Sequence, residues 1–416
     1  MLLGCVADDL TGATDLGGTL AREGRRVVLL VGSSDRAADV RNHDAVVVAL
    51  KSRSIPAADA VTRSLLALDG LRRAGAERIY FKYASTFDST PAGNIGPVSD
   101  ALADALDAPI VVACPSFPAN GRVVRDGVLL VNGTPLAESP MRAHPLNPMT
   151  ESSVVRLLAA QTSRPVGLVD RRVVAAGSAA IRVSLDELRR EGVRHAVVDA
   201  ADERDLDAIA GAVALDRLVT GGSALAGAIA RVGLAPTRRS APASRGWNLA
   251  GTPAAVLAGS ASHATRTQVE AFRRTNPILE IDPAEAVADD GLPNRLADTA
   301  VALLGDGPVL VAAVPPAGEP SGRVGSAIER TLAAVAQRLV DDGVRRLVVA
   351  GGETSGAVVG ALGLDRLEVG REIDPGVPVV VAPEAGGRPA IGLVLKSGNF
   401  GSDDFFARAL AALGGG

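Results

Sequence analysis

Two adjacent carboxylates, Asp8 and Asp9, follow the apolar run 2–7 and precede a helical pattern over 11–23. The apolar run predicts a buried strand, so one carboxylate is expected to cap free N–H groups at the helix start. Neighbouring strand residues point to opposite sides, so both carboxylates cannot cap. The other is a candidate to bind a polyhydroxylated ligand or to act as a general base. Capping alone is the alternative.

Cations and hydroxyls follow two further apolar runs. Lys51-Ser52-Arg53-Ser54 follows the run 45–50, and Lys82 lies near the end of the run 78–83. Strand ends in a parallel sheet lie at one edge, where ligands bind. An Arg fork can hold a carboxylate, and hydroxyl groups can hydrogen-bond a polyol, which suits a small hydroxy acid. The alternative is a set of helix caps and surface charges. The hydroxyl and carboxylate candidates after Lys82 are Ser85, Thr86 and Asp88.

Lysine is rare in this chain. Of 43 basic residues only three are lysines, namely Lys51, Lys82 and Lys396. A chain that uses arginine almost everywhere is expected to keep lysine where a compact point charge is needed. Four of the ten aromatic residues lie between Tyr80 and Phe87, around one of these lysines. Packing of a strand is the plain explanation for that cluster.

Three loops rich in glycine and serine each follow an apolar run and open a helical pattern. They are Gly259–Ser262, Gly351–Gly356 and Ser397–Gly401, the last preceded by Lys396. Small residues let backbone N–H groups approach a phosphate, and a helix N-terminus favours negative charge. The sequence contains neither a P-loop nor a dinucleotide fingerprint. The three loops together predict a polyphosphate site, and three ordinary helix caps are the alternative.

Alternating strand and helix patterns must position these groups. Continuous apolar strands separated by amphipathic helices predict an α/β protein with largely parallel sheets covered by helices. A chain of 416 residues favours two domains, predicted at 1–235 and 253–416 with a linker at 236–252. The segment 115–148 breaks the rhythm, and its Asp-Gly and Asn-Gly pairs predict a hairpin over 123–133.

Composition excludes several classes of function. The net charge of −4 and the lack of basic runs exclude a nucleic-acid partner. The first residues lack a basic segment, and no apolar run reaches the roughly 20 residues of a membrane span, so we expect a cytoplasmic protein. Cys5 and Cys114 lie in apolar runs and are expected to be reduced core thiols. The four histidines lack metal-site spacing, and His144 and His263 are expected in a turn and on the surface.

The motifs together resemble the four-carbon acid sugar kinases. The residues that carry the resemblance are Ala7–Ala13, Lys51–Ser54, Gly351–Gly356 and Lys396–Gly401, which span nearly the whole chain. The resemblance implies an N-terminal domain that binds an acid sugar, a C-terminal domain that binds the nucleotide, and a cleft between them. It also implies ATP-dependent phosphorylation of the terminal C4 hydroxyl of a four-carbon sugar acid, with ATP and Mg²⁺ as cofactors and a homodimer as a compatible assembly.

Within the family, the segment Lys82–Gly96 resembles the 3-oxo-tetronate 4-kinase branch, as do Cys114–Pro118 with Gly121-Arg122, and His144–Thr150. Ala84 and Ala92 depart from that branch, where Cys and Glu are usual. A threonate or erythronate kinase of the same family is the nearest alternative. A non-catalytic acid-sugar-binding protein is another, although the phosphate loops are intact. A nicotinamide dehydrogenase would need the missing fingerprint.

The resemblance assigns roles to both sets of residues. Asp9 is expected to be the general base, with Asp88 as second candidate, and Lys396 to counter charge that develops on the phosphates. No metal ligands are predicted. The expected acid-sugar ligands are Asp8, Asp9, Arg53, Lys82, Ser85, Thr86 and Asp88. The expected ATP ligands are Ser260, Gly352, Glu353, Thr354, Ser355 and Gly398.

Overall fold

The computed structural model describes residues 2–32, 40, 42–143, 147–233, 247, 249–313 and 322–415. The chain forms an α/β protein with two compact units, Met1–Ala241 and Pro242–Gly416, called here the N-terminal and C-terminal units. Most of the predicted linker 236–252 lies outside the described residues, as does His144. In the described part of the chain, no helix is long and apolar enough to cross a membrane.

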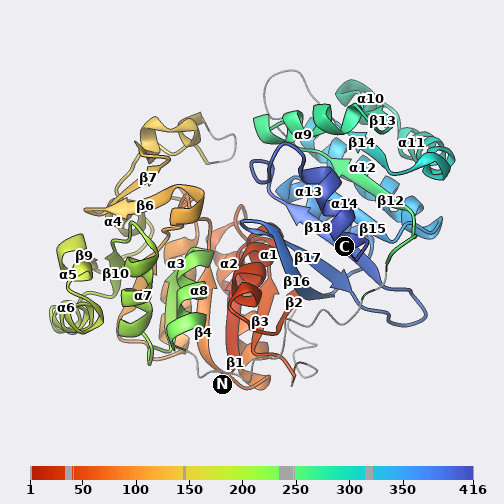
Figure 1. The fold of residues 1–416 in the computed structure, drawn as a ribbon. Coiled ribbons are helices and arrows are strands. Elements are labelled where there is room, and N and C mark those ends of the chain that lie inside the picture. Colours follow the sequence, from red (N-terminus) through yellow and green to blue (C-terminus); the bar gives the residue numbers. More distant parts are fainter. Residues whose placement is uncertain are drawn as a thin grey trace. The chain divides into compact units, whose positions relative to one another are not determined.

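The N-terminal unit contains a parallel sheet with the strand order β2-β3-β1-β4-β11-β5-β10-β9 (Figure 1). The contacts among helices form two groups, one of α2, α3 and α4 and one of α1, α5, α6, α7 and α8, as expected where helices cover both faces of a sheet. The strands are β1 (Leu2–Ala7), β2 (Val27–Val31), β3 (Ala45–Ala49), β4 (Ala76–Lys82), β5 (Val111–Cys114), β9 (Val166–Val169), β10 (His195–Val198) and β11 (Leu218–Gly221). The helices are α1 (Leu10–Arg22), α2 (Ala57–Arg73), α3 (Ile95–Ala105), α4 (Val154–Ala159), α5 (Arg171–Ala175), α6 (Ser178–Arg190), α7 (Glu203–Ala212) and α8 (Ser223–Ala228).

The predicted hairpin is present as a small antiparallel sheet of β6 (Arg122–Arg125), β7 (Val128–Val131) and β8 (Thr134–Pro135). Residues that follow strands of the large sheet hold it in place. The Asp199 carboxylate, just after β10, accepts hydrogen bonds from the backbone N–H groups of Asp126 and Gly127. Ser116, just after β5, accepts one from Val124 N–H. The hairpin is therefore fixed at the carboxyl ends of the parallel strands.

The C-terminal unit has the strand order β13-β14-β12-β15-β18-β17-β16. Its first five strands are parallel, whereas β17 runs antiparallel to β18 and β16 antiparallel to β17, so the sheet is mixed. The strands are β12 (Ala254–Ala258), β13 (Ile278–Glu280), β14 (Val309–Ala312), β15 (Arg346–Ala350), β16 (Arg366–Asp374), β17 (Val377–Ala382) and β18 (Ile391–Lys396). The helices are α9 (His263–Arg273), α10 (Pro283–Ala288), α11 (Leu292–Leu303), α12 (Arg323–Asp341), α13 (Gly352–Ala361) and α14 (Phe405–Leu413).

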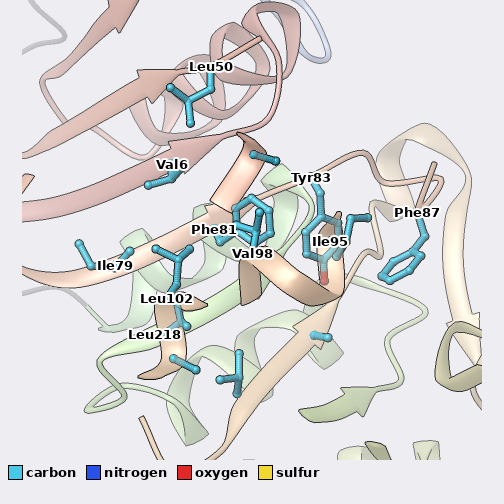
Figure 2. Close-up of a cluster of buried hydrophobic side chains, with 14 of the residues drawn as sticks. Val6, Leu50, Ile79, Phe81, Tyr83, Phe87, Ile95, Val98, Leu102 and Leu218 are labelled. Carbon is cyan, nitrogen blue, oxygen red and sulfur yellow. The ribbon is translucent and has the colours of Figure 1, made fainter. Parts of the chain in front are cut away.

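The aromatic cluster of the sequence lies in the core of the N-terminal unit (Figure 2). Tyr83 makes edge-to-face contacts with Phe81 and Phe87, at ring-centroid distances of 5.6 and 5.4 Å. All three rings are buried, and burying a large apolar side chain contributes about 1.5–3 kcal/mol. The packing explanation is therefore correct for the rings. They anchor the end of β4 and the loop after it. Both cysteines are also buried, in β1 and β5, as predicted.

Candidate active site

Three neighbouring strands of the N-terminal unit end at the same level. Ala7 of β1 pairs with Ala49 of β3 on one side and with Lys82 of β4 on the other. The loops that follow therefore leave from one edge of the sheet, called here the first edge. Backbone bonds join them, because the Asp8 carbonyl accepts from the N–H of Ser52 at 2.9 Å. The predicted convergence of these loops is observed.

Asp8, Asp9 and Arg53 form one ion cluster at this edge. Arg53 donates from Nε and Nη2 to the two carboxylate oxygens of Asp8, both at 2.8 Å. Its Nη2 also donates to Oδ1 of Asp9 at 2.7 Å. The two carboxylates do have different roles, since the chain turns between them. Such a bidentate pair is strong and fixes geometry, so Arg53 is largely occupied by protein carboxylates.

Asp9 is the N-cap of α1. Its carboxylate accepts hydrogen bonds from the Gly12 amide at 2.9 Å and from the Thr11 hydroxyl at 2.8 Å. Burial alone would raise the pKa of Asp9, but Arg53, Lys82 and these hydrogen bonds together hold it below its ordinary value. Asp9 is therefore a carboxylate at neutral pH. It can accept a hydrogen bond from a ligand hydroxyl, and its side chain is 22% exposed.

Asp8 lies deeper, with only 3% of its side chain exposed. Burial raises the pKa of Asp8, and the Asp9 charge adds to this, although Arg53 opposes both. Burial lowers the pKa of the Arg53 guanidinium, but the surrounding carboxylates raise it well above its ordinary value overall. The cluster is held together by charge pairing in a poorly hydrated place. Asp8 thus holds Arg53 in place through two hydrogen bonds.

Lys82 completes the first edge. A Cβ placed on Gly12 would collide with the Lys82 ammonium and the Asp9 carboxylate, so glycine at this place lets both groups approach the helix start. Lys82 is buried, and its charge acts on both Asp8 and Asp9. The pattern of a rare lysine beside paired carboxylates is therefore borne out in space. Lys51, by contrast, is exposed.

The loop after β4 places the remaining acid-sugar candidates. Phe87 N–H bonds to the Ala84 carbonyl, and Phe87 adopts a positive φ of 47° while its ring stays buried. The turn in between carries Ser85 and Thr86, both half-buried. Asp88 follows and is buried, and its charge acts on Arg53. The Asp88 charge is thus close enough to influence Arg53 at the first edge.

A second edge lies in the C-terminal unit, at the carboxyl ends of β12, β15 and β18. Ala350 of β15 pairs with Ala258 on one side and with Lys396 on the other. The three glycine- and serine-rich loops begin directly after these residues and therefore share this edge. A Cβ placed on Gly259 would collide with the Thr354 hydroxyl, so the first two loops are in close contact.

Lys396 is fully buried at the second edge. Its ammonium donates to the Thr265 hydroxyl and to the Gly398 carbonyl, both at 3.0 Å. Burial lowers the pKa of Lys396 to about 7. Within the described residues its hydrogen-bond partners are neutral, so they do not offset the cost of burying its charge. An anion that arrives here would favour the charged form.

The Gly398 loop is packed against the start of α9. Ser262, the N-cap of α9, and Thr265 both donate to the Gly398 carbonyl, at 2.6 and 2.8 Å. A Cβ on Gly398 would collide with the hydroxyl of Ser260, so only glycine allows this approach. Ser262, Thr265 and Lys396 therefore all donate to the same Gly398 carbonyl.

The start of α13 offers groups for an anion. Gly352 and Glu353, in its first turn, are exposed, so their backbone amides and the helix dipole are accessible. Ser355 is fully buried, and its hydroxyl has no hydrogen-bond partner in the described part of the chain. A buried hydroxyl without a partner is unusual in a folded protein and is able to bind a ligand. A phosphate oxygen would fit the donors of this helix start.

Sequence reasoning missed several residues that hold these edges. Thr265 bridges Lys396 and Gly398, and the Gln268 amide donates to the carbonyls of three consecutive residues of the last loop, 400–402, each at 3.0 Å. Asn94 donates to the carbonyl of Ser52 at 2.7 Å. The spacing of Ser262 and Thr265 marks a helix cap, which was a usable signal. Asn94 and Gln268 carried none, because their partners are distant in sequence.

A cavity of about 480 Å³ lies elsewhere in the C-terminal unit, between the segments Gly251–Ala254 and Leu304–Pro308. These segments lead into the amino ends of β12 and β14, whereas the second edge is at the carboxyl ends. Within the described residues, no group of three or more His, Cys, Asp or Glu side chains could hold a metal ion.

The comparisons with known proteins agree with the division into two units. Residues 3–229 match the model of a sugar-binding N-terminal domain, and residues 255–406 match that of a nucleotide-binding C-terminal domain. A sugar-binding unit joined to a nucleotide-binding unit defines a class of sugar kinases. The chain belongs to the four-carbon acid sugar kinase family, as its motifs had indicated.

Relatives of similar length support this membership. The 3-oxo-tetronate kinase of Burkholderia multivorans is 47% identical to this chain, with 100% of the chain and 98% of the relative covered. The enzyme of the same name from Salmonella typhimurium is 41% identical, with 98% of each covered.

Two solved structures share the fold. A putative tRNA synthase from Salmonella typhimurium LT2 has a TM-score of 0.86 and 39% identity, covering 98% of each chain. Haemophilus influenzae protein HI1011 has a TM-score of 0.78 and 38% identity, covering 99% of this chain and 100% of that one.

Proposed function

We propose that this protein is a 3-oxo-tetronate 4-kinase, which transfers the γ-phosphoryl group of ATP to the terminal hydroxyl of a four-carbon 3-oxo acid. The observation that carries the proposal is the pair of edges, one with Asp9 and Lys82 in a sugar-binding unit and one with Lys396 in a nucleotide-binding unit. Full-length relatives at 47% identity bear this activity in their names.

The second edge would receive the ATP phosphates. The exposed start of α13, the unpaired Ser355 hydroxyl and the close approach at Gly398 fit a polyphosphate chain. The expected ligands Ser260, Gly352, Glu353, Thr354, Ser355 and Gly398 all come from the three loops at this edge. Negative phosphates beside Lys396 would favour its protonated form. The ammonium would then stabilise the negative charge that develops during transfer.

Mg²⁺ is expected with the nucleotide. Magnesium in kinases keeps several water ligands and takes one or two carboxylates together with phosphate oxygens, so a cage of three protein ligands is not required. Glu353, exposed in the first turn of α13, supplies a carboxylate at the second edge and would hold the ion. Bound there, the ion would neutralise charge on the phosphates.

The first edge would receive the acid sugar. Asp9 would accept the hydrogen of the terminal hydroxyl and orient the oxygen for attack, with Asp88 as the second candidate. Phosphoryl transfer depends mainly on positioning and electrostatics, so a carboxylate with a low pKa suffices for this role. Lys82, Ser85 and Thr86 would contact the hydroxyl and oxo groups. The reaction requires a state in which this hydroxyl meets the γ-phosphate in line.

A coupled assay of ADP release tests the proposal. The purified protein is given ATP and Mg²⁺ with 3-oxo-tetronates, threonates and erythronates, and the product is identified as the 4-phosphate by mass spectrometry and ³¹P NMR. We expect the highest kcat/KM for a 3-oxo acid. A clear preference for threonate or erythronate would mean that the 3-oxo acid is not the substrate. A lack of ADP release with every acid would overturn the kinase assignment.

The role of Asp9 is tested by Asp9→Asn, which keeps a capping oxygen. Turnover should fall by about 10²-fold or more, and some stability should be lost as well, because the Asp9 charge pairs with Arg53. Turnover within about threefold of the parent would exclude Asp9 as the base. Asp88→Asn, measured beside it, decides whether the second candidate takes this place.

A further inference from the structure

A four-carbon acid carries a carboxylate, which needs a cation to bind it. The first edge has little unpaired positive charge. Arg53 makes three hydrogen bonds to Asp8 and Asp9, and the cluster of two carboxylates with Arg53 and Lys82 sums to no net charge. An anionic ligand would therefore gain little from this cluster alone. A further cation close to it is required.

Arg122 is such a cation. It opens the hairpin strand β6, which bonds through Val124 to Ser116 and Ala200 at the carboxyl ends of the parallel strands. Within the described residues, its guanidinium makes one hydrogen bond, from Nη1 to the Asn120 carbonyl. Its Nε is enclosed and has no partner within the described residues. An unpaired enclosed donor is costly, and an acceptor that reaches this fork would relieve the cost.

The charge of Asp15 shows where Arg122 lies. Burial lowers the pKa of Arg122, while the Asp15 carboxylate raises it, so the two groups are close. Asp15 in turn accepts a hydrogen bond from the Ser223 hydroxyl at 2.5 Å. Ser223 begins α8 just after β11, whose last residue, Gly221, pairs with Lys82. Asp15 and Ser223 therefore lie beside the strand that pairs with β4, close to the first edge.

Helix α1 links the two places directly. Gly12, against which Lys82 and Asp9 pack, and Asp15 are three residues apart and share a face of α1. Side chains at this spacing are about 5–6 Å apart. A chain of four carbons spans roughly 3.8 Å, the length of three consecutive bonds. A four-carbon acid therefore has the length to reach from Asp9 toward the Arg122 end.

We propose that Arg122 binds the carboxylate of the sugar acid, with the Asp15 charge, itself held by Ser223, favouring the charged guanidinium, so that the terminal hydroxyl is directed to Asp9. The five N–H donors of arginine allow it to face Asp15 and a ligand at once. The inference rests on the proposed function for its ligand class. It does not depend on the 3-oxo group, since threonate and erythronate carry the same carboxylate.

The test compares Arg122→Gln, Arg122→Lys and Arg125→Gln. Arg125 is exposed at the other end of β6 and serves as the matched control. Steady-state rates are measured with the preferred acid and with a neutral four-carbon ketose. Arg122→Gln should raise KM for the acid by roughly 10- to 100-fold, with a smaller change in kcat and no loss with the ketose. Arg122→Lys should raise KM for the acid by about tenfold, because lysine lacks the guanidinium fork that can hold both carboxylate oxygens.

Equilibrium binding separates this inference from the kinase assignment. If the parent binds acids without releasing ADP, the proposed function fails, and weaker acid binding by Arg122→Gln still supports the carboxylate site. If the parent is an active kinase and the acid KM of Arg122→Gln stays within about threefold of the Arg125→Gln control, the inference is overturned. Should Arg122→Gln fail to fold, an unchanged preference for acid over ketose in Arg122→Lys would overturn it equally.

Discussion

Lys82 and Lys396 occupy corresponding places in two units and have opposite surroundings. Each ends a buried parallel strand, β4 or β18, and each is itself buried. The charge of Lys82 acts on two neighbouring carboxylates, Asp8 and Asp9. Lys396 donates only to a hydroxyl and a carbonyl, and burial lowers its pKa to about 7.

The two lysines differ in the charge that surrounds them, and this difference indicates which ligand each edge suits. Carboxylates already balance the first lysine, so its edge is complete in charge and offers oriented polar groups to a ligand. The second lysine has no anion beside it in the described chain, so its edge gains most from a ligand that brings negative charge. A sugar-acid hydroxyl suits the first edge and a polyphosphate suits the second. Four experiments test this contrast.

Removing each lysine should produce different kinetic losses. Lys396→Met should lower kcat by about 10³-fold, because the charge that opposes the transferring phosphoryl group is lost. The acid should still bind. Lys82→Met should raise KM for the acid and leave ATP binding unchanged. Steady-state kinetics with calorimetric titration of both ligands measures the split. Equal effects of the two variants on ATP binding would contradict the expectation that Lys396 serves the nucleotide and Lys82 serves the acid.

The ion cluster of the first edge should be needed for stability. Arg53→Met leaves Asp8 and Asp9 buried without their main partner and should cost about 3–5 kcal/mol of unfolding free energy. Urea unfolding of the variant and the parent measures it. Arg125→Met, an exposed arginine of the same unit, is the control and should change stability by less than about 0.5 kcal/mol. A loss below about 1 kcal/mol for Arg53→Met would show that the cluster is well hydrated.

The Gly398 approach should be specific for the nucleotide. Gly398→Ala places a methyl group against the Ser260 hydroxyl and should raise KM for ATP by roughly 10-fold or more, while KM for the acid stays unchanged. The double variant Gly398→Ala with Ser260→Gly removes the colliding hydroxyl and should recover part of the loss. No change in KM for ATP would place the phosphates elsewhere.

The pH dependence of stability should report Lys396. Its folded pKa, about 7, lies below the ordinary 10.5, so the unfolded chain binds more protons between these values. The contribution of this group to stability therefore rises with pH across that window. Lys396→Met should melt at a higher temperature relative to the parent at pH 7 than at pH 10. A difference that does not vary with pH would mean that the lysine is hydrated.

Much of the fold followed from local patterns. Apolar runs and helix periodicity predicted nearly every strand end that carries a functional residue, and the Asp-Gly and Asn-Gly turns predicted the β6–β7 hairpin correctly. The pairing of β16 with β17 was missed, because β16 contains charged residues along its length and lacks a clean alternation. Short strands such as β13 gave too few residues for a pattern.

The family and the loops at the strand ends could be predicted from the sequence, because strand, glycine-rich loop and helix start are encoded by adjacent residues. Which charges meet became clear only from the folded chain. Folding paired Arg53 with Asp8 and Asp9, so that this arginine is occupied, and it left the Arg122 Nε without a partner in the described chain. It also enclosed Lys396 among neutral groups. These outcomes depend on contacts between residues far apart in sequence, where neither spacing nor propensity carries information.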